Sequence, residues 1–363
     1  MAENPLKQLA SHGQSVWLDF IRRELVTGGG LAKLVAHDGI AGLTSNPAIF
    51  EKAMGGGNEY AGAIRALRAD RLDAMALYET LAIEDIRGAA DVMRGVYDTS
   101  AAGDGYVSLE VSPFLAHDTA GTIAEAHRLW AAVARPNLMI KVPATSAGLP
   151  AIEALLADGI NVNVTLLFAR SVYEQVAARH IAALERRAGE GKPVAHIASV
   201  ASFFVSRIDS VIDALPDRNI DPLRGKVAIA NAKLAYEGFT RLYSGTGWNK
   251  LAHLGAQPQR LLWASTGTKN AAYRDVLYVE ELIGPQTVNT LPPATLDAFR
   301  DHGRCRASLA EDLPGARATL AALAAAGVSL DAVTGKLLED GVKLFADAFD
   351  KLLKAVESAR AAA

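Results

Sequence analysis

Lys141 stands in the middle of an apolar run, residues 138–146, which reads LMIKVPATS. An unpaired ammonium group is unfavourable in a strand that is buried on both faces, because removing the charge from water costs free energy. In apolar surroundings, however, a lysine holds its proton less tightly, and the neutral amine can attack a carbonyl carbon to form an imine. We interpret Lys141 as a candidate nucleophile. The alternative is an outward-pointing lysine whose ammonium group reaches water between helices.

Other polar side chains stand at the ends of apolar runs. They are two carboxylates, one amide and three hydroxyls: Asp19, Glu110, Asn46, Thr165, Ser202 and Ser265. Singly, each has an ordinary explanation, since Asp and Asn form caps and turns and Ser and Thr are common in strands. Together, at equivalent ends of different strands, they are expected to meet at one mouth. Carboxylates beside a lysine can move protons during imine formation and deprotonate a hydroxyl so that a C–C bond breaks.

Two cations follow late apolar runs at positions suited to a phosphate group. Arg207 lies five residues past Ser202 at a strand-to-helix junction, where backbone N–H groups and a guanidinium can hold a phosphate together. Lys269 follows the seventh run, close to Ser265 and Thr268. The loops after strands seven and eight are the usual phosphate region of a (β/α)₈ barrel. A solvated surface charge is the alternative for either cation.

Metal and nucleotide chemistry have weaker signals. The eight histidines are scattered, and no HExxH motif or cysteine cluster is present. Asp19 and Glu110 could hold Mg²⁺, but the neighbouring lysine would then need another role. The stretch GEGKP, residues 189–193, lacks the frame of a phosphate-binding P-loop. We therefore expect no metal and no cofactor.

The pattern of apolar runs predicts the fold. Eight short β-rich runs alternate with longer helical patterns, at residues 15–20, 39–45, 106–112, 138–144, 160–168, 196–204, 260–266 and 286–291. Most are nearly continuous in apolar residues, which is typical of parallel strands covered on both faces. Their number and the length of 363 residues favour a closed (β/α)₈ barrel. An open, doubly wound sheet is the alternative.

Three helical additions are expected around this barrel: an arm before residue 14, an insertion at about 58–98 and a closing segment at about 329–360. The closing segment carries a helical stripe that is predicted to cover the barrel, formed by Val333, Leu337, Leu344, Phe345, Phe349 and Leu352. Residues 1–363 are predicted to form one domain.

Composition excludes several classes of protein. About half of the residues are hydrophobic, which argues against disorder. The chain has 37 basic and 40 acidic residues and a net charge of −3, so neither a nucleic-acid nor a membrane partner is expected. The start lacks a signal-peptide pattern and no apolar run reaches membrane-spanning length, which predicts a cytoplasmic protein. A homodimer is compatible with the sequence, although no pattern in it signals one.

Several strings in the chain resemble the transaldolases, particularly the bacterial type. In order along the sequence these strings are GLTSNPAIFEKA, SLEVSP, IKVPAT, NVTLLF, SRID, WASTGTKN and TVNTLPP. The resemblance runs from about residue 13 to the end of the chain. It implies a (β/α)₈ barrel of the class I aldolase type, with the Schiff-base lysine on the fourth strand.

The resemblance also implies roles for individual residues. Lys141 matches the Schiff-base lysine, Asp19 the proton-transfer aspartate, and Glu110 with Thr165 the pair that holds a catalytic water. The implied substrate contacts are Asn46, Ser202, Phe204, Arg207, Ser265 and Lys269. Gly267 and Ala271 depart from the family pattern, in which Ser and Pro are expected, so the loop around Lys269 is predicted to be more pliable.

The implied reaction moves a dihydroxyacetone unit from sedoheptulose 7-phosphate to glyceraldehyde 3-phosphate, in the non-oxidative pentose phosphate pathway. Glu110 and Phe204 follow the transferase pattern, whereas related fructose 6-phosphate aldolases carry glutamine at the glutamate position. An aldolase-like lyase is the first alternative. A metal-assisted sugar-phosphate isomerase or lyase is less favoured, because Lys141 would then need another role. A non-catalytic sugar-phosphate binding protein is also less favoured, because Lys, Asp, Glu and Thr occur together.

Overall fold

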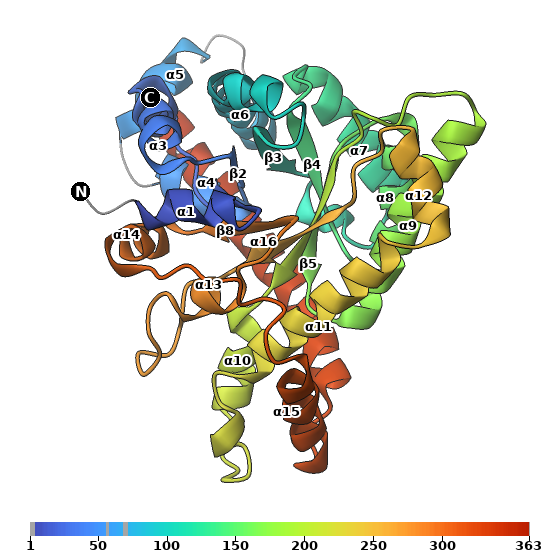
Figure 1. The fold of residues 1–363 in the computed structure, drawn as a ribbon. Helices are drawn as coiled ribbons and strands as arrows, with labels where there is room; N and C mark the ends of the chain where they lie inside the picture. The colour runs from blue at the N-terminus through green and yellow to red at the C-terminus, as the bar shows by residue number, and fades with distance from the viewer. Residues whose placement is uncertain (1–3, 56–57, 68–71, 363) are drawn as a thin grey trace.

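The computed structural model describes residues 4–55, 58–67 and 72–362. Eight parallel strands close into a barrel in which each strand pairs with its sequence neighbour and β8 pairs with β1 (Figure 1). The strands are β1 Gln14–Leu18, β2 Gly42–Leu43, β3 Tyr106–Glu110, β4 Leu138–Pro143, β5 Val162–Leu167, β6 Ser199–Phe204, β7 Arg260–Ala264 and β8 Thr287–Leu291. The closed (β/α)₈ prediction is confirmed, and the open sheet is excluded.

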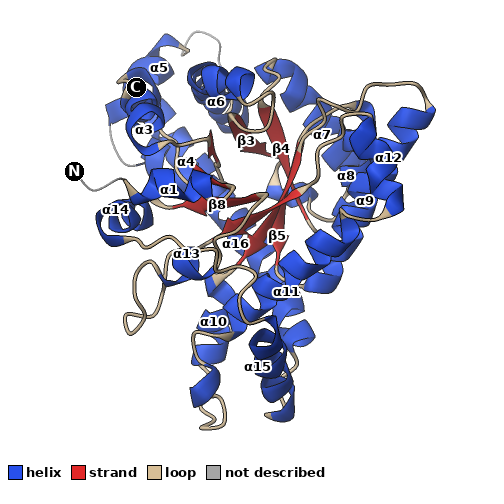
Figure 2. Cartoon of the chain, viewed as in Figure 1, coloured by secondary structure: helices blue, strands red, loops and turns tan. Residues whose placement is uncertain are grey.

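Helices surround the barrel, as the colouring by secondary structure makes clear (Figure 2). They are α1 Pro5–Ser11, α2 Arg23–Thr27, α3 Gly30–Asp38, α4 Pro47–Gly55, α5 Ala61–Ala66, α6 Ala74–Thr99, α7 Thr119–Val133, α8 Gly148–Asp158, α9 Arg170–Gly189, α10 Ser206–Asp213, α11 Val227–Leu242, α12 Thr246–His253, α13 Leu277–Glu281, α14 Pro293–His302, α15 Leu313–Ala325 and α16 Leu330–Ala362. Short 3₁₀ turns lie at η1 Asn58–Tyr60, η3 Pro113–Leu115 and η4 Asp221–Leu223. Strands covered by these helices are buried on both faces, which explains their continuous apolar sequence.

Strand β2 is much shorter than the run predicted at residues 39–45. Gly42 pairs with Trp17, and a Cβ atom at residue 42 would lie 2.5 Å from the indole ring. A glycine is therefore needed at residue 42, beside the Trp17 indole. The next residues, Thr44 and Ser45, leave the strand but stay buried.

The insertion at residues 58–98 is helical, as predicted, but it contains more than one helix. It comprises η1, α5 and α6, and residues 56–57 and 68–71 lie outside the described part of the chain. Asp73 caps α6 by accepting a hydrogen bond from the Ala76 amide at 2.8 Å. The predicted helical arm is α1, which is capped by Asn4 and has Pro5 in its first turn.

Helix α16, red in Figure 1, crosses the barrel behind the strands and packs on α4 and α6. Phe345, Phe349 and Leu352 are buried, as the predicted stripe requires. Leu344 was predicted in the same stripe, but it is 55% exposed. The buried residues recur at spacings of four and three, and Leu344 lies one residue, or about 100°, off that line.

Within the described residues, no single helix is long and apolar enough to cross a membrane. Helices α15 and α16 meet the length and composition criteria only when taken together across an 88° bend.

Candidate active site

Lys141 is buried inside the barrel, with 5% of its surface exposed. Its Nζ donates a hydrogen bond of 2.9 Å to the Ser45 carbonyl and lies 3.7 Å from Glu110 Oε2. Glu110 and Lys141 are register partners on β3 and β4, so both side chains point to the same face of the sheet. The outward-pointing alternative for Lys141 is therefore excluded.

Glu110 is the last residue of β3 and is enclosed by protein. Burial raises the pKa of its carboxyl to about 7, against the opposing effect of the Lys141 charge. A carboxyl group with a pKa near neutrality can both give and take a proton under physiological conditions. Tyr78 of the inserted helix α6 lines the same small cavity as Glu110 and forms an edge-to-face contact with Phe349 of α16. The insertion therefore contributes to the wall behind this carboxylate.

Asp19 follows β1 and lies at the same end of the barrel. Its Oδ1 accepts a 2.7 Å hydrogen bond from Thr44, whose hydroxyl also lies 3.0 Å from that of Thr290. Burial raises the pKa of Asp19 above its ordinary value, while the Lys141 charge and the Thr44 hydrogen bond oppose the rise. The charges of Lys269 and Arg207 also lower the pKa of Asp19, as that of Lys141 does.

Thr165 occupies β5 and is fully buried. Thr165 Oγ1 and Glu110 Oε2 are both buried without a hydrogen-bond partner in the described part of the chain. Because Lys141 pairs with Asn163 in the sheet, Thr165, two residues further along β5, points to the same face. Leu166 then adopts a left-handed φ of 59°, and the register with β6 shifts between Val164 and Leu167.

Ser202 lies in the barrel interior within a chain of polar groups. Its hydroxyl donates to Asn163 Oδ1 at 2.7 Å, and Asn163 Nδ2 donates to Ser108 Oγ at 3.0 Å. Asn46 follows β2, and its side-chain oxygen accepts a 3.0 Å hydrogen bond from the Ile49 amide at the start of α4. The Asn46 oxygen is thus used as a helix cap, as the ordinary explanation for a strand-end Asn proposes.

The predicted phosphate-binding residues lie around α10 and the loop after β7. The Arg207 guanidinium stacks on the Phe204 ring, with 5.2 Å between Cζ and the ring centroid. Burial lowers the pKa of Arg207, and the charge of Asp19 partly offsets this effect. The Ser265 hydroxyl lies 2.9 Å from that of Ser206, beside Arg207. Lys269 is exposed in the loop that follows.

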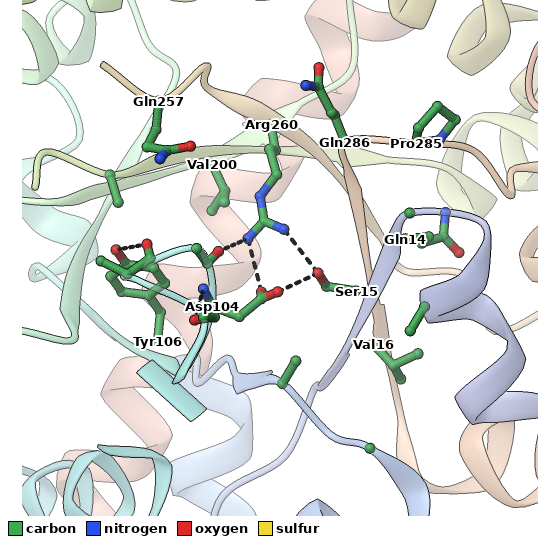
Figure 3. Close-up of a pocket in the computed structure, with 18 of the residues that line it drawn as sticks. Gln14, Ser15, Val16, Asp104, Tyr106, Val200, Gln257, Arg260, Pro285 and Gln286 are labelled. Atoms are coloured by element: carbon green, nitrogen blue, oxygen red, sulfur yellow. Dashed lines mark hydrogen bonds and ion pairs between the residues drawn. The ribbon is translucent and has the colours of Figure 1, made fainter. Parts of the chain in front are cut away.

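A separate cavity of about 710 Å³ lies at the opposite, N-terminal end of the barrel (Figure 3). Arg260 spans it, donating to Ser15 Oγ at 2.9 Å, Gly103 O at 2.7 Å and Asp104 Oδ1 at 2.9 Å. Figure 3 shows the guanidinium between Asp104 and Ser15. Because the Arg260 charge is matched by Asp104, this network stabilises the N-terminal end of the barrel.

The described residues do not form a cluster of side chains that could bind a metal ion. Across 4–55, 58–67 and 72–362, no three His, Cys, Asp or Glu side chains are arranged to hold a metal ion.

Three residues of the site are absent from the predictions made from the sequence. Thr44 binds the Asp19 carboxylate, the Ser45 carbonyl accepts from Lys141, and Asn163 joins Ser202 to Ser108. Asn163 could have been predicted from the sequence, because it stands two residues before Thr165 in the same strand and therefore faces the same side of the sheet. The Ser45 contact could not, since a backbone carbonyl carries no sequence signature.

The fold is a closed (β/α)₈ barrel with a buried lysine beside a carboxylate at its mouth. This combination is typical of barrels of the class I aldolase type. Residues 16–356 match the model of the Transaldolase/Fructose-6-phosphate aldolase family. The chain belongs to this family, and the resemblance seen in the sequence is confirmed.

Curated relatives cover almost the entire chain. A transaldolase from Neisseria gonorrhoeae is 49% identical over 349 residues, which are 96% of this chain and 98% of that protein. A transaldolase from Thiobacillus denitrificans is 47% identical, covering 96% of this chain and 99% of the relative. A transaldolase from a Parafrankia species is 48% identical over 97% of both chains.

Proposed function

We propose that the protein is a transaldolase that carries a dihydroxyacetone unit on Lys141. The observation that carries this proposal is the placement of Lys141 Nζ, buried at the barrel mouth and 3.7 Å from Glu110 Oε2. Relatives that are 47–49% identical over nearly their full length are named transaldolases, and the chain is accordingly an enzyme of the transferase class.

The first half-reaction forms the imine. The neutral Lys141 amine attacks the C2 carbonyl of a ketose phosphate and gives a carbinolamine. Glu110, through a water held with Thr165, delivers the proton that lets hydroxide leave as water. The raised pKa of Glu110, about 7, suits a group that must give a proton here and take it back during hydrolysis. Glu110 Oε2 and Thr165 Oγ1 have no hydrogen-bond partner in the described part of the chain, so they are suitable contacts for that water.

The second step breaks the C3–C4 bond. Asp19 accepts the proton of the C4 hydroxyl, the C4–O group becomes an aldehyde, and the electron pair of the C3–C4 bond moves into the iminium. The iminium becomes an enamine, so it serves as the electron sink and no metal ion is required. The enamine remains on Lys141 until an aldose phosphate accepts it and the steps run in reverse.

Substrate groups are assigned to the surrounding side chains. Arg207 and Lys269, with Ser265, bind the phosphate group, and Asn46 and Ser202 bind substrate hydroxyls. Phe204 forms the platform on which Arg207 stacks. The substrate pair is sedoheptulose 7-phosphate and glyceraldehyde 3-phosphate, and the products are erythrose 4-phosphate and fructose 6-phosphate.

We also propose that residues 1–363 act as one domain. The inserted helix α6 is tied to α2 by Asp85, which accepts a 2.7 Å hydrogen bond from Arg23. Asp85 also accepts a 2.7 Å hydrogen bond from Tyr60, within the insertion itself. Sugar phosphates are the expected partners, without nucleic acid or membrane. Cytoplasmic location and a homodimer stay predictions.

A transfer assay distinguishes this function from its alternatives. Purified protein is given fructose 6-phosphate with or without erythrose 4-phosphate, and glyceraldehyde 3-phosphate is followed. A transaldolase releases it steadily only when the acceptor is present. Steady release without the acceptor would support the aldolase-like lyase, and no release in either mixture would refute both. Inhibition by a chelator would favour the metal-assisted alternative.

A further inference from the structure

The loop that carries Lys269 is joined to α10, the helix that carries Arg207, at both of its ends. At its start, the Ser206 amide donates to the Ser265 carbonyl at 3.2 Å, and the two hydroxyls lie 2.9 Å apart. Beyond Lys269, the side chains of Asn270 and Tyr273 both donate to Asp213 Oδ2, at 3.1 and 2.7 Å. Lys269 therefore lies between two attachments to the same helix.

Asp213 is the last residue of α10 and Arg207 lies in its first turn. They are six positions apart, which is about 9 Å along a helix that rises ~1.5 Å per residue. A helix of this length is rigid, so fixing the loop to Asp213 also fixes it relative to Arg207. The position of Asp213 is itself secured, because Arg224 donates to its carbonyl and to that of Leu215.

The loop needs this attachment because its own sequence does little to restrain it. Gly267 allows a close approach, since a Cβ atom there would lie 2.8 Å from Thr295 Oγ1 of α14. Ala271 provides no ring constraint where a proline would restrict the backbone. The Tyr273 ring lies against Gly225, where a Cβ atom would lie 3.0 Å from it. The ring and hydroxyl of Tyr273 therefore hold the far end of the loop.

Lys269 and Asp213 line one cavity of about 220 Å³ together with Ser210, Asn270, Tyr273 and Tyr278. Asp213 Oδ1 is buried there without a partner among the described residues. Asp213 thus faces the cavity that Lys269 also lines, while its Oδ2 restrains the loop. The ammonium group remains close enough to influence Asp19 at the mouth.

We propose that Asp213 is a positioning residue that sets Lys269 opposite Arg207, so that both cations meet the phosphate group of one substrate. This inference rests on the proposed function, because it assigns the two cations to a sugar phosphate. Its consequence is specificity: Asp213 favours phosphorylated over unphosphorylated sugars without touching the reacting carbon atoms.

The test compares Asp213→Ala, Tyr273→Phe and Lys269→Ala on fructose 6-phosphate and on unphosphorylated fructose, with erythrose 4-phosphate as acceptor. For Tyr273→Phe we expect the KM for fructose 6-phosphate to rise about tenfold at nearly unchanged kcat, since a hydrogen bond to a charged group is lost. Asp213→Ala should raise the KM for fructose 6-phosphate by at least the same factor. The kcat/KM for fructose should not change. Tyr236→Phe is the matched control, because it removes one hydroxyl bond, to the Pro285 carbonyl at 3.1 Å, away from the loop.

A double variant separates positioning from general damage. If Asp213 acts through Lys269, the double variant Asp213→Ala with Lys269→Ala should lose no more kcat/KM for fructose 6-phosphate than Lys269→Ala alone. Additive losses, or equal losses on fructose and fructose 6-phosphate, would overturn the inference. If the wild-type protein transfers no dihydroxyacetone unit, the proposed function fails instead. In that case, the affinity for fructose 6-phosphate is measured by calorimetry in the same variants. Asp213 is a positioning residue if the double variant binds no more weakly than Lys269→Ala alone.

Discussion

Gly341 of α16 lies directly against Leu166, the residue that follows Thr165 on β5. A Cβ atom at residue 341 would be 2.9 Å from Leu166 Cδ2. Leu166 is buried and has a left-handed backbone, with φ at 59°. The closing helix therefore packs against the side chain of Leu166, the residue with left-handed backbone next to Thr165.

Gly341→Val tests this contact. The added side chain must push Leu166 and α16 apart, and we expect kcat to fall about tenfold or more because Thr165 moves. Overpacking should also lower stability by ~1–3 kcal/mol. Gly335→Val is the control, since it makes the same change on the same helix where nothing lies within 4 Å of a Cβ atom. Equal activity in the two variants would show that α16 does not position Thr165.

Lys141→Arg keeps a positive charge but removes the amine that forms the imine, because guanidinium is not deprotonated in proteins. We expect transfer activity to fall by at least about 10³-fold. Circular dichroism and thermal unfolding should show that the variant remains folded. Wild-type turnover by the folded variant would exclude Lys141 as the nucleophile.

The pH dependence of imine formation should report Glu110. Its pKa is raised to about 7 by burial, and the protonated form is the one that helps hydroxide leave. The single-turnover rate of imine formation should therefore fall as pH rises through about 7. Glu110→Gln cannot titrate, so it should lose this part of the profile along with about 10²-fold in rate. An unchanged profile in Glu110→Gln would assign the titration to another group.

Thr44→Val removes the hydrogen bond to Asp19 while nearly preserving side-chain shape. This hydrogen bond lowers the pKa of Asp19, so its loss should raise that pKa and reduce the ionised fraction. The rate of C–C cleavage should drop about tenfold at low pH, and the defect should shrink as pH rises. Thr240→Val, which removes an exposed hydroxyl bond to the Tyr236 carbonyl, is the control. A loss of the same size at every pH would contradict the role given to Thr44.

The sequence predicted the barrel well because parallel strands buried on both faces leave a clear apolar pattern. Each of the eight predicted runs overlaps one strand of the barrel. The run at 39–45 yields only Gly42–Leu43, and residue 42 must be a glycine because the Trp17 indole lies beside it. Leu344 was misplaced because an apolar residue next to a helical stripe looks the same in sequence whether it faces the core or solvent.

Within the candidate site, the position of polar residues in or at the ends of apolar runs accounted for Glu110, Lys141 and Thr165, since the carboxyl ends of barrel strands meet at one mouth. It did not reveal the hydrogen bonds between elements. The contacts of Ser45 with Lys141 and of Asp213 with Tyr273 join residues 96 and 60 positions apart. Their existence depends on how the closed barrel brings loops together, which local patterns do not encode.

Covalent trapping tests the central claim most directly. The protein is incubated with fructose 6-phosphate, with and without EDTA, reduced with borohydride and analysed by peptide mass spectrometry. We predict a reduced dihydroxyacetone adduct on Lys141, equally abundant in the presence of EDTA. A folded protein that forms no adduct, or forms it on another lysine, would contradict the proposed role of Lys141.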